Sequence, residues 1–133
     1  MMMLDDPTLL RQQALIGDTW CNADDGAMLE VTDPATGERL GTVPSMGGAE
    51  TRRAVAAAQE AFAQWSKTTA KHRGQILRKW HDLILAHQED LARIMTAEQG
   101  KPLSESRGEI AFAASFIDWF AEQARTFEQR ARE

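Results

Sequence analysis

The stretch Leu91-Ala-Arg-Ile-Met-Thr-Ala-Glu-Gln-Gly-Lys-Pro-Leu103 decides the fold, because it ends one amphipathic helix and begins another. Gly100, just past a helix end, adopts the left-handed conformation without a Cβ penalty. Pro102 suits a first helical position, where the missing N–H had no partner. The local sequence therefore predicts a tight helix-to-helix corner, with the rest of the chain on one side of it or the other.

The helix after the corner, expected over residues 102–130, carries two apolar stripes. At about 100° per residue the stripes together cover about half of the helix circumference, so this helix needs cover on two sides. Two interpretations remain open: the helix is buried centrally among other helices, or the second stripe is a docking face for protein outside this chain. One stripe comprises Ile110, Ala113, Ile117, Phe120, Ala124 and Phe127, and the second comprises Phe112, Phe116 and Trp119.

Two more helices are expected before the corner, over residues 47–65 and 69–99, the latter with a break near 87–88. Gly47 fits the cap position of the first, with Glu50 at its third residue, and Thr69 caps the second. Each helix has an apolar stripe that is expected to face a core. The stripes comprise Val55, Ala58, Phe62 and Trp65 in the first helix, and Ile76, Leu77, Trp80, Leu83 and Ile84 in the second.

The first third of the chain has the pattern of β structure, expected within residues 14–44. The Gly-Asp pair at 17–18 suits a two-residue hairpin turn. Residues 28–32 alternate apolar and polar side chains, as a half-buried strand does, and a second strand returns after a turn. The chain is thus predicted to be one α+β unit, residues 1–133, with a small antiparallel sheet followed by three long amphipathic helices.

Composition argues against several kinds of partner. A net charge of −5 and a pI near 5.2 disfavour a nucleic-acid surface, which needs clustered Lys and Arg, and also an anionic membrane. The acidic start, Met1-Met-Met-Leu-Asp-Asp-Pro7, lacks the basic region of a signal peptide. The single cysteine, Cys21, forms no internal disulfide, so a reducing compartment, the cytoplasm, is expected.

Residues with catalytic or metal-binding chemistry are few. Neither a helix N-terminus nor a cation is near Cys21 in the sequence, so a structural role is expected for this thiol. His72, His81 and His87 do not form a pair at the i, i+4 spacing of helical metal sites. The glycines form neither a dinucleotide loop nor a triphosphate loop. Composition and spacing alone therefore predict a soluble unit with no visible reaction centre.

Glu98 is the unusual residue of the helix corner. Its negative charge is expected in the last turn of a helix, where the helix dipole is already negative. A cation close to the carboxylate would remove this conflict. Two candidates remain: the ammonium group of Lys101, or a bound metal ion.

Several short motifs carry a resemblance to a known family. They are Leu10-Arg-Gln-Gln-Ala-Leu-Ile16, Val31-Thr-Asp-Pro-Ala-Thr-Gly37, Ile76-Leu-Arg-Lys-Trp80, Glu98-Gln-Gly-Lys-Pro-Leu103, Ala113-Ala-Ser-Phe-Ile117 and Trp119-Phe-Ala-Glu122. With them, residues 9–127 resemble the N-terminal part of the aldehyde dehydrogenase superfamily, and most of all its bacterial succinate-semialdehyde branch. The resemblance implies that this segment forms part of the cofactor-binding domain of the family's α/β fold.

The resemblance also implies a reaction, the NAD(P)-dependent oxidation of an aldehyde to a carboxylic acid. In the family a cysteine thiolate attacks the aldehyde, hydride passes to the nicotinamide, and water activated by a glutamate releases the acid. These catalytic groups and the cofactor loop belong to later segments of family members. No catalytic or cofactor-binding residue is therefore expected here, NADP or NAD is not expected to bind this chain alone, and the chain is expected to be inactive.

The end of the chain departs from the family pattern. After Phe127 the family continues with an aromatic-Gly-acid-Thr-Ile-Pro sequence, whereas this chain reads Glu128-Gln-Arg-Ala-Arg-Glu133. The expectation is a truncated segment, in which the missing remainder of the enzyme or a homo-oligomer partner covers the Phe112/Phe116/Trp119 stripe. The alternative is a freestanding helical interaction or regulatory module derived from the same unit.

One binding site follows from the resemblance. Some family members bind a monovalent cation through backbone carbonyls before the Pro-x-x-Gly turn and through an acidic side chain in the helix corner. The matching positions here are Val31, Thr32 and Glu98. Oxygen ligands of this kind are those that hard cations favour.

Overall fold

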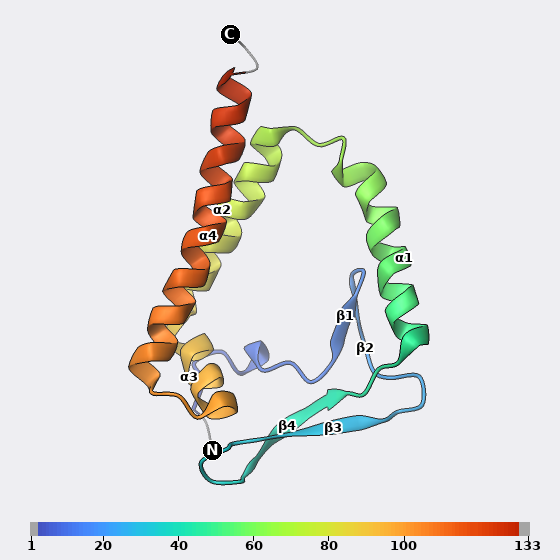
Figure 1. Cartoon of the computed structure of the whole chain (residues 1–133), viewed down its shortest axis with the longest axis vertical. Coiled ribbons are helices and arrows are strands. Elements are labelled where there is room, and N and C mark those ends of the chain that lie inside the picture. The colour runs from blue at the N-terminus through green and yellow to red at the C-terminus, as the bar shows by residue number, and fades with distance from the viewer. Residues whose placement is uncertain (1–2, 131–133) are drawn as a thin grey trace. The chain divides into compact units, whose positions relative to one another are not determined.

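A computed structural model describes residues 3–130 of the chain (Figure 1). Two short antiparallel ribbons and four α-helices follow a single turn of 3-10 helix at Pro7–Leu9. The elements are β1 (Ala14–Ile16), β2 (Thr19–Cys21), β3 (Met28–Thr32), β4 (Arg39–Pro44), α1 (Gly48–Trp65), α2 (Ala70–Ala86), α3 (Gln88–Gln99) and α4 (Leu103–Arg130). This order is the expected one, and His87 separates α2 from α3 where the sequence predicted a break in the helix over residues 69–99.

Contacts divide the chain into two compact units, described separately below. The first unit extends to Lys67 and includes Ala97–Gly100 at the end of α3. The second comprises Thr68–Thr96 and continues from Lys101 through α4.

In the first unit, both ribbons are hairpins whose turns depend on glycine. β1 pairs with β2 through Ile16 and Thr19, and Gly17 between them has φ of 65°, as a type II′ turn requires. β3 pairs with β4, and the turn between them is held by Asp33, whose Oδ1 accepts a hydrogen bond from the Ala35 amide at 2.8 Å. The register of this second ribbon shifts between Val31 and Thr32.

Helix α1 begins at the predicted cap. Gly47 is the N-cap residue, and Glu50 Oε2 accepts a hydrogen bond from the Gly47 amide at 3.1 Å. The carboxylate also stands in the first turn, where the helix dipole favours a negative charge. The combination explains why α1 begins here without a capping hydroxyl or amide side chain.

In the second unit, α2 packs against α4, and the two lie side by side (Figure 1). Gly74 permits close approach, since a Cβ there would be 3.2 Å from the Ala121 carbonyl oxygen. One turn later Arg78 forms ion pairs with Asp118 and Glu122. The α2–α4 interface therefore includes small and charged side chains. At the start of α2, Thr69 accepts a hydrogen bond from the His72 amide, as the sequence predicted.

The buried apolar side chains of the described chain are all small. They are Ala23, Ala92, Ala114 and Ala121. The stripes predicted for α1 and α2 include positions that are not core, because Phe62 is 57% exposed and Trp80 is 54% exposed. Leu77 and Ile84 of the α2 stripe are half-buried. The side chain of Phe127 lies outside those described.

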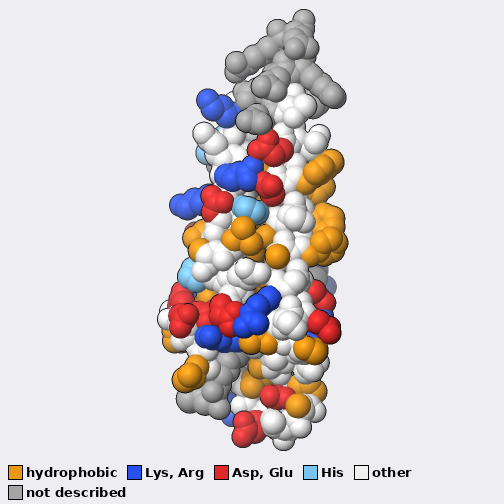
Figure 2. Space-filling view, turned by 90° about the vertical axis from the view of Figure 1, so that its left-hand side faces the viewer, with side chains coloured by type: hydrophobic (Ala, Val, Ile, Leu, Met, Phe, Trp, Pro, Cys, Tyr) orange, Lys and Arg blue, Asp and Glu red, His pale blue; other side chains and the backbone are white. Residues whose placement is uncertain are grey.

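The aromatic residues of α4 are also exposed. Phe112, Phe116 and Trp119 retain 65, 52 and 57% of their accessible surface. Figure 2 shows apolar side chains reaching the surface between charged ones. None of the helices in the described residues is long and apolar enough to cross a membrane.

Candidate functional site

The helix corner is formed as the sequence predicted. Gly100 follows α3 with φ of 72°, and α4 begins directly after Pro102. The corner also touches the β3–β4 turn, because a Cβ atom on Gly100 would be only 2.9 Å from Cγ of Pro34. Glycine is therefore required here both by its left-handed backbone and by the proline ring.

The three candidate cation ligands come from the two segments that meet at this contact. Val31 and Thr32 end β3 at the register shift and lead into the turn that contains Pro34. Glu98 lies in the last turn of α3, two residues before Gly100, and its side chain is exposed. The segments thus approach each other at Pro34, and the available donors are carbonyl and carboxylate oxygens, the class that suits a hard cation.

Lys101, the residue expected to offset the charge of Glu98, has an ion-pair partner of its own. Its Nζ pairs with Glu109, in the second turn of α4. That Lys101 also offsets the charge of Glu98 stays a prediction. Because Lys101 follows Gly100, the chain has already changed direction at this residue, and the ammonium group extends along the next helix.

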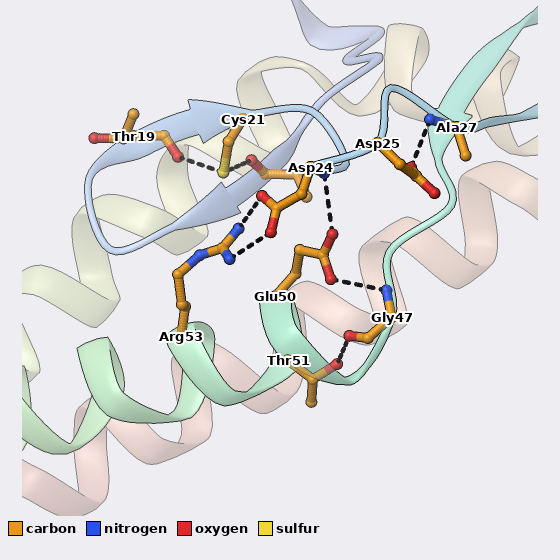
Figure 3. A network of polar contacts seen from close by, with 10 residues as sticks. Thr19, Cys21, Asp24, Asp25, Ala27, Gly47, Glu50, Thr51 and Arg53 are labelled. Atoms are coloured by element: carbon orange, nitrogen blue, oxygen red, sulfur yellow. Dashed lines mark hydrogen bonds and ion pairs between the residues drawn. The ribbon is translucent and has the colours of Figure 1, made fainter.

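A polar network joins the β1–β2 hairpin to the start of α1 (Figure 3). Glu50 is only 6% exposed, and its Oε1 accepts a hydrogen bond from the Asp24 amide at 3.0 Å. The Asp24 carboxylate in turn accepts two hydrogen bonds from the Arg53 guanidinium, at 2.7 and 2.6 Å. The Glu50 carboxylate therefore caps α1 and also holds the loop at the Asp24 amide. The bidentate ion pair between Asp24 and Arg53 ties the same loop to α1 a second time.

The hydrogen bonds of this network determine its charges. The backbone N–H of Asp24 is the main cause that holds the pKa of Glu50 below its ordinary value. The hydrogen bond from Arg53 lowers the pKa of Asp24, and the same bond raises the pKa of Arg53. All three groups are thus stabilised in their charged forms, as a structural clamp requires and a proton-transfer site does not.

Cys21 lies next to this network, in the strand β2. Its thiol donates to the Ala14 carbonyl at 3.5 Å, across the β1–β2 pair, and contacts the Thr19 carbonyl at 3.7 Å. The fold brings the charge of Arg53 close enough to interact with it, a cation that sequence reasoning missed. That guanidinium is bound to Asp24, so it is not presented to the sulfur as a dedicated partner.

The histidines do not converge on a metal site. His72 and His81 are on α2, and His87 lies between α2 and α3. His81 Nδ1 is 3.0 Å from Oδ1 of its neighbour Asp82. Within residues 3–130 no group of three or more His, Cys, Asp or Glu side chains is arranged to hold a metal ion.

The family comparison is specific. The model of the aldehyde dehydrogenase family matches residues 20–133. The chain is 58% identical over 124 residues to glutarate-semialdehyde dehydrogenase of Pseudomonas putida, covering 93% of this chain and 26% of the relative. It is 55% identical over 124 residues to the NADP-dependent succinate-semialdehyde dehydrogenase of Escherichia coli, with the same coverage.

Solved structures agree. A succinate-semialdehyde dehydrogenase from Burkholderia pseudomallei is 63% identical, with a TM-score of 0.88, over 90% of this chain and 25% of that one. An aldehyde dehydrogenase from Brucella melitensis has a TM-score of 0.91 at 52% identity, over 92% of this chain and 26% of that one. The predicted fold class is thereby confirmed as the N-terminal part of that fold. The chain spans about a quarter of the length of the relatives it matches.

Proposed function

Because the chain belongs to the aldehyde dehydrogenase family, we propose that it is the N-terminal segment of an NAD(P)-dependent succinate-semialdehyde dehydrogenase, inactive by itself. The observation that carries this proposal is its 55% identity to the Escherichia coli succinate-semialdehyde enzyme across 93% of the chain. Glutarate semialdehyde, the one-carbon-longer substrate named for the Pseudomonas putida relative, is the competing choice.

Two properties of the chain support inactivity. The reaction needs a reactive thiolate, and the single thiol, Cys21, donates to a strand carbonyl beside a guanidinium already bound to Asp24. In addition, the chain spans only about a quarter of the length of the relatives it matches. We accordingly assign no catalytic residue to this chain, and we propose that NADP or NAD binds only when the rest of the fold is present.

The proposal extends to surroundings and partners. We propose that residues 1–133 act as one unit of a cofactor-binding domain, in the reducing cytoplasm that a single cysteine suits. The missing remainder of the enzyme or a homo-oligomer partner is expected to cover Phe112, Phe116 and Trp119. A nucleic acid or an anionic membrane is not expected as a partner, given the net charge of −5.

The test is an assay of the pure chain with succinate semialdehyde or glutarate semialdehyde, each with NADP or NAD. No increase in absorbance from reduced cofactor is expected in any combination. A covalent fusion to the remainder of the Pseudomonas putida relative is the positive control, and this fusion is expected to oxidise one of the semialdehydes. Steady formation of reduced cofactor by the chain alone would contradict the inactivity.

The exposed aromatic residues of α4 favour one alternative, a freestanding helical interaction or regulatory module. Light scattering and dye binding separate the two. An autonomous module predicts a stable monomer in which Trp80 and Trp119 stay exposed, whereas a segment of a larger fold predicts a dye-binding, aggregating state.

We also propose a monovalent cation site formed by the carbonyls of Val31 and Thr32 and the carboxylate of Glu98. The contact between Gly100 and Pro34 supports it, because it brings the β3–β4 turn to the helix corner. The urea midpoint of the chain in sodium or potassium chloride should exceed that in choline chloride at equal ionic strength. Glu98→Gln should remove this difference, and an equal response of the variant and the parent would exclude the site.

A further inference from the structure

The interface between α2 and α4 leaves the exposed aromatic side chains of both helices outside it. The side of α4 that faces α2 carries Ala121 and Asp118, and the side of α2 that faces α4 carries Gly74 and Arg78. Ala114 and Ala121 are buried, at 1 and 6% exposure. Small groups and ion pairs thus form part of this interface, whereas larger aliphatic side chains of both helices, such as Leu77 and Ile117, are half-buried.

The aromatic residues of α4 lie on its opposite side. Phe112 and Phe116 are each two residues from buried Ala114, and Trp119 is two residues from buried Ala121. Two residues correspond to about 200° around an α-helix, so these rings are directed away from α2. We call Phe112, Phe116, Trp119 and Phe120 the aromatic face of α4; each of the four is more than half exposed.

The rings of the aromatic face are ordered by one another. Phe112 and Phe116 stack edge to face with centroids 4.9 Å apart, and Trp119 and Phe120 do so at 5.0 Å. A pre-ordered aromatic surface loses little side-chain entropy on binding, and aromatic residues dominate the centres of protein interfaces. The aromatic face of α4 therefore has the properties of a protein–protein interface.

The outer side of α2 is apolar as well. Trp80 lies two residues from Arg78, and Ile76 lies two residues from Gly74, so both point away from α4. Trp80 is 54% exposed and Ile76 is 42% exposed. The α2–α4 pair is therefore built as an internal layer, with apolar groups on both of its outer faces.

The two apolar outer faces of the α2–α4 pair favour the missing remainder of the enzyme over a second copy of the chain as the polypeptide that covers them. In a twofold dimer each copy contributes one self-complementary patch, so a second copy covers one outer face of the pair and leaves the other exposed. The relatives contain about three quarters of their length beyond the part that this chain matches, enough polypeptide to cover both.

Resting on the proposed function, we propose that the aromatic face of α4 is the docking surface for the polypeptide that follows the matched segment in the relatives. We propose further that this polypeptide binds when supplied as a separate chain. Docking needs no covalent link, because the face is already formed and exposed in the chain by itself. Assembly of the two pieces should then restore the dehydrogenase that neither piece provides.

The test mixes the chain with the remainder of the Pseudomonas putida glutarate-semialdehyde dehydrogenase, purified separately. An equimolar complex on size exclusion and the oxidation of glutarate or succinate semialdehyde are expected, with neither piece active alone. Phe116→Glu and Trp119→Glu should each weaken the complex at least tenfold, whereas Phe116→Leu should bind nearly as the parent does. Because both rings are exposed, circular dichroism of the free variants should match the parent.

Ser104→Glu is the matched control. It adds the same charge to the same helix, in the exposed first turn, where the dipole accepts it, and about 80° around the helix from the side that faces α2. This variant should bind and restore activity as the parent does. Equal weakening by Ser104→Glu and Phe116→Glu would overturn the assignment of the face.

The outcomes separate this inference from the proposed function. A complex without activity, together with an inactive covalent fusion, would uphold docking and contradict the proposed dehydrogenase. An active fusion without a complex from the separate pieces would overturn docking and uphold the proposed function. A homodimer of the chain that Phe116→Glu dissociates, with no binding of the remainder, would identify a second copy as the occupant and overturn the inference.

Discussion

Replacing Gly100 by alanine should be the most damaging single-methyl change at the helix corner. Gly100 has φ of 72°, and the left-handed conformation costs an alanine about 1–2 kcal/mol. The new Cβ would also lie 2.9 Å from Cγ of Pro34, well inside the ~3.5–4.0 Å at which carbon atoms rest. The proline ring does not rotate away, so the two segments must separate, which adds about 1–3 kcal/mol.

Gly37→Ala isolates the steric part of this cost. Gly37 has φ of 75°, but a Cβ there meets nothing within 4 Å. Both variants therefore carry the same backbone strain, and the difference between them, about 1–3 kcal/mol, is the contact with Pro34.

Urea unfolding followed by far-ultraviolet circular dichroism measures the difference. The buffer should contain trimethylamine N-oxide, an osmolyte that favours the folded state and so stabilises a chain with a small apolar core. With an m-value of about 1–2 kcal/mol per M, Gly100→Ala should unfold about 1 M earlier than Gly37→Ala. Equal midpoints would refute the close approach of the corner to the β3–β4 turn.

Other predictions test the remaining contacts. The pKa of Glu50 is lowered in the fold, so its contribution to folding stability is present above the ordinary pKa of 4.5 and is lost as the pH falls through the folded pKa. Glu50→Gln should therefore make the urea midpoint less dependent on pH in the acid range. Gly74→Val should cost about 1–3 kcal/mol by separating α2 from α4, whereas Gly108→Val, with nothing within 4 Å, should cost only helix propensity. Arg78→Met should cost about 0.5–1 kcal/mol, since its ion pairs are half exposed, and the loss should shrink at high salt.

The caps and corners were predictable from sequence because their physics is local. Glu50 and the Gly47 amide that it accepts from are three residues apart, and Thr69 and the His72 amide are equally close. The positive φ of Gly100 and the position of Pro102 likewise follow from neighbouring residues. Signals of this kind act within one helical turn, so a single sequence contains both partners.

The direction of each helix face was less predictable. Periodicity placed Ile76 and Trp80 of α2 on a common stripe, which the sequence assigned to a core, and both are exposed. Leu77 and Ile84 of the same stripe are half-buried, so only part of the stripe lies toward a core. Periodicity identifies an apolar face without indicating whether the covering polypeptide lies in the same chain.

By itself the sequence of this chain determined its elements, their order and the family to which their motifs belong. The tertiary structure decided which side chains meet: Arg53 with Asp24, 29 residues apart, and Arg78 with Asp118, 40 residues apart. It also decided that small residues lie in the α2–α4 interface, whereas the aromatic face of α4 is exposed. The physical reason is that caps and turns depend on groups within a few residues, whereas pairing across tens of residues depends on how whole helices pack.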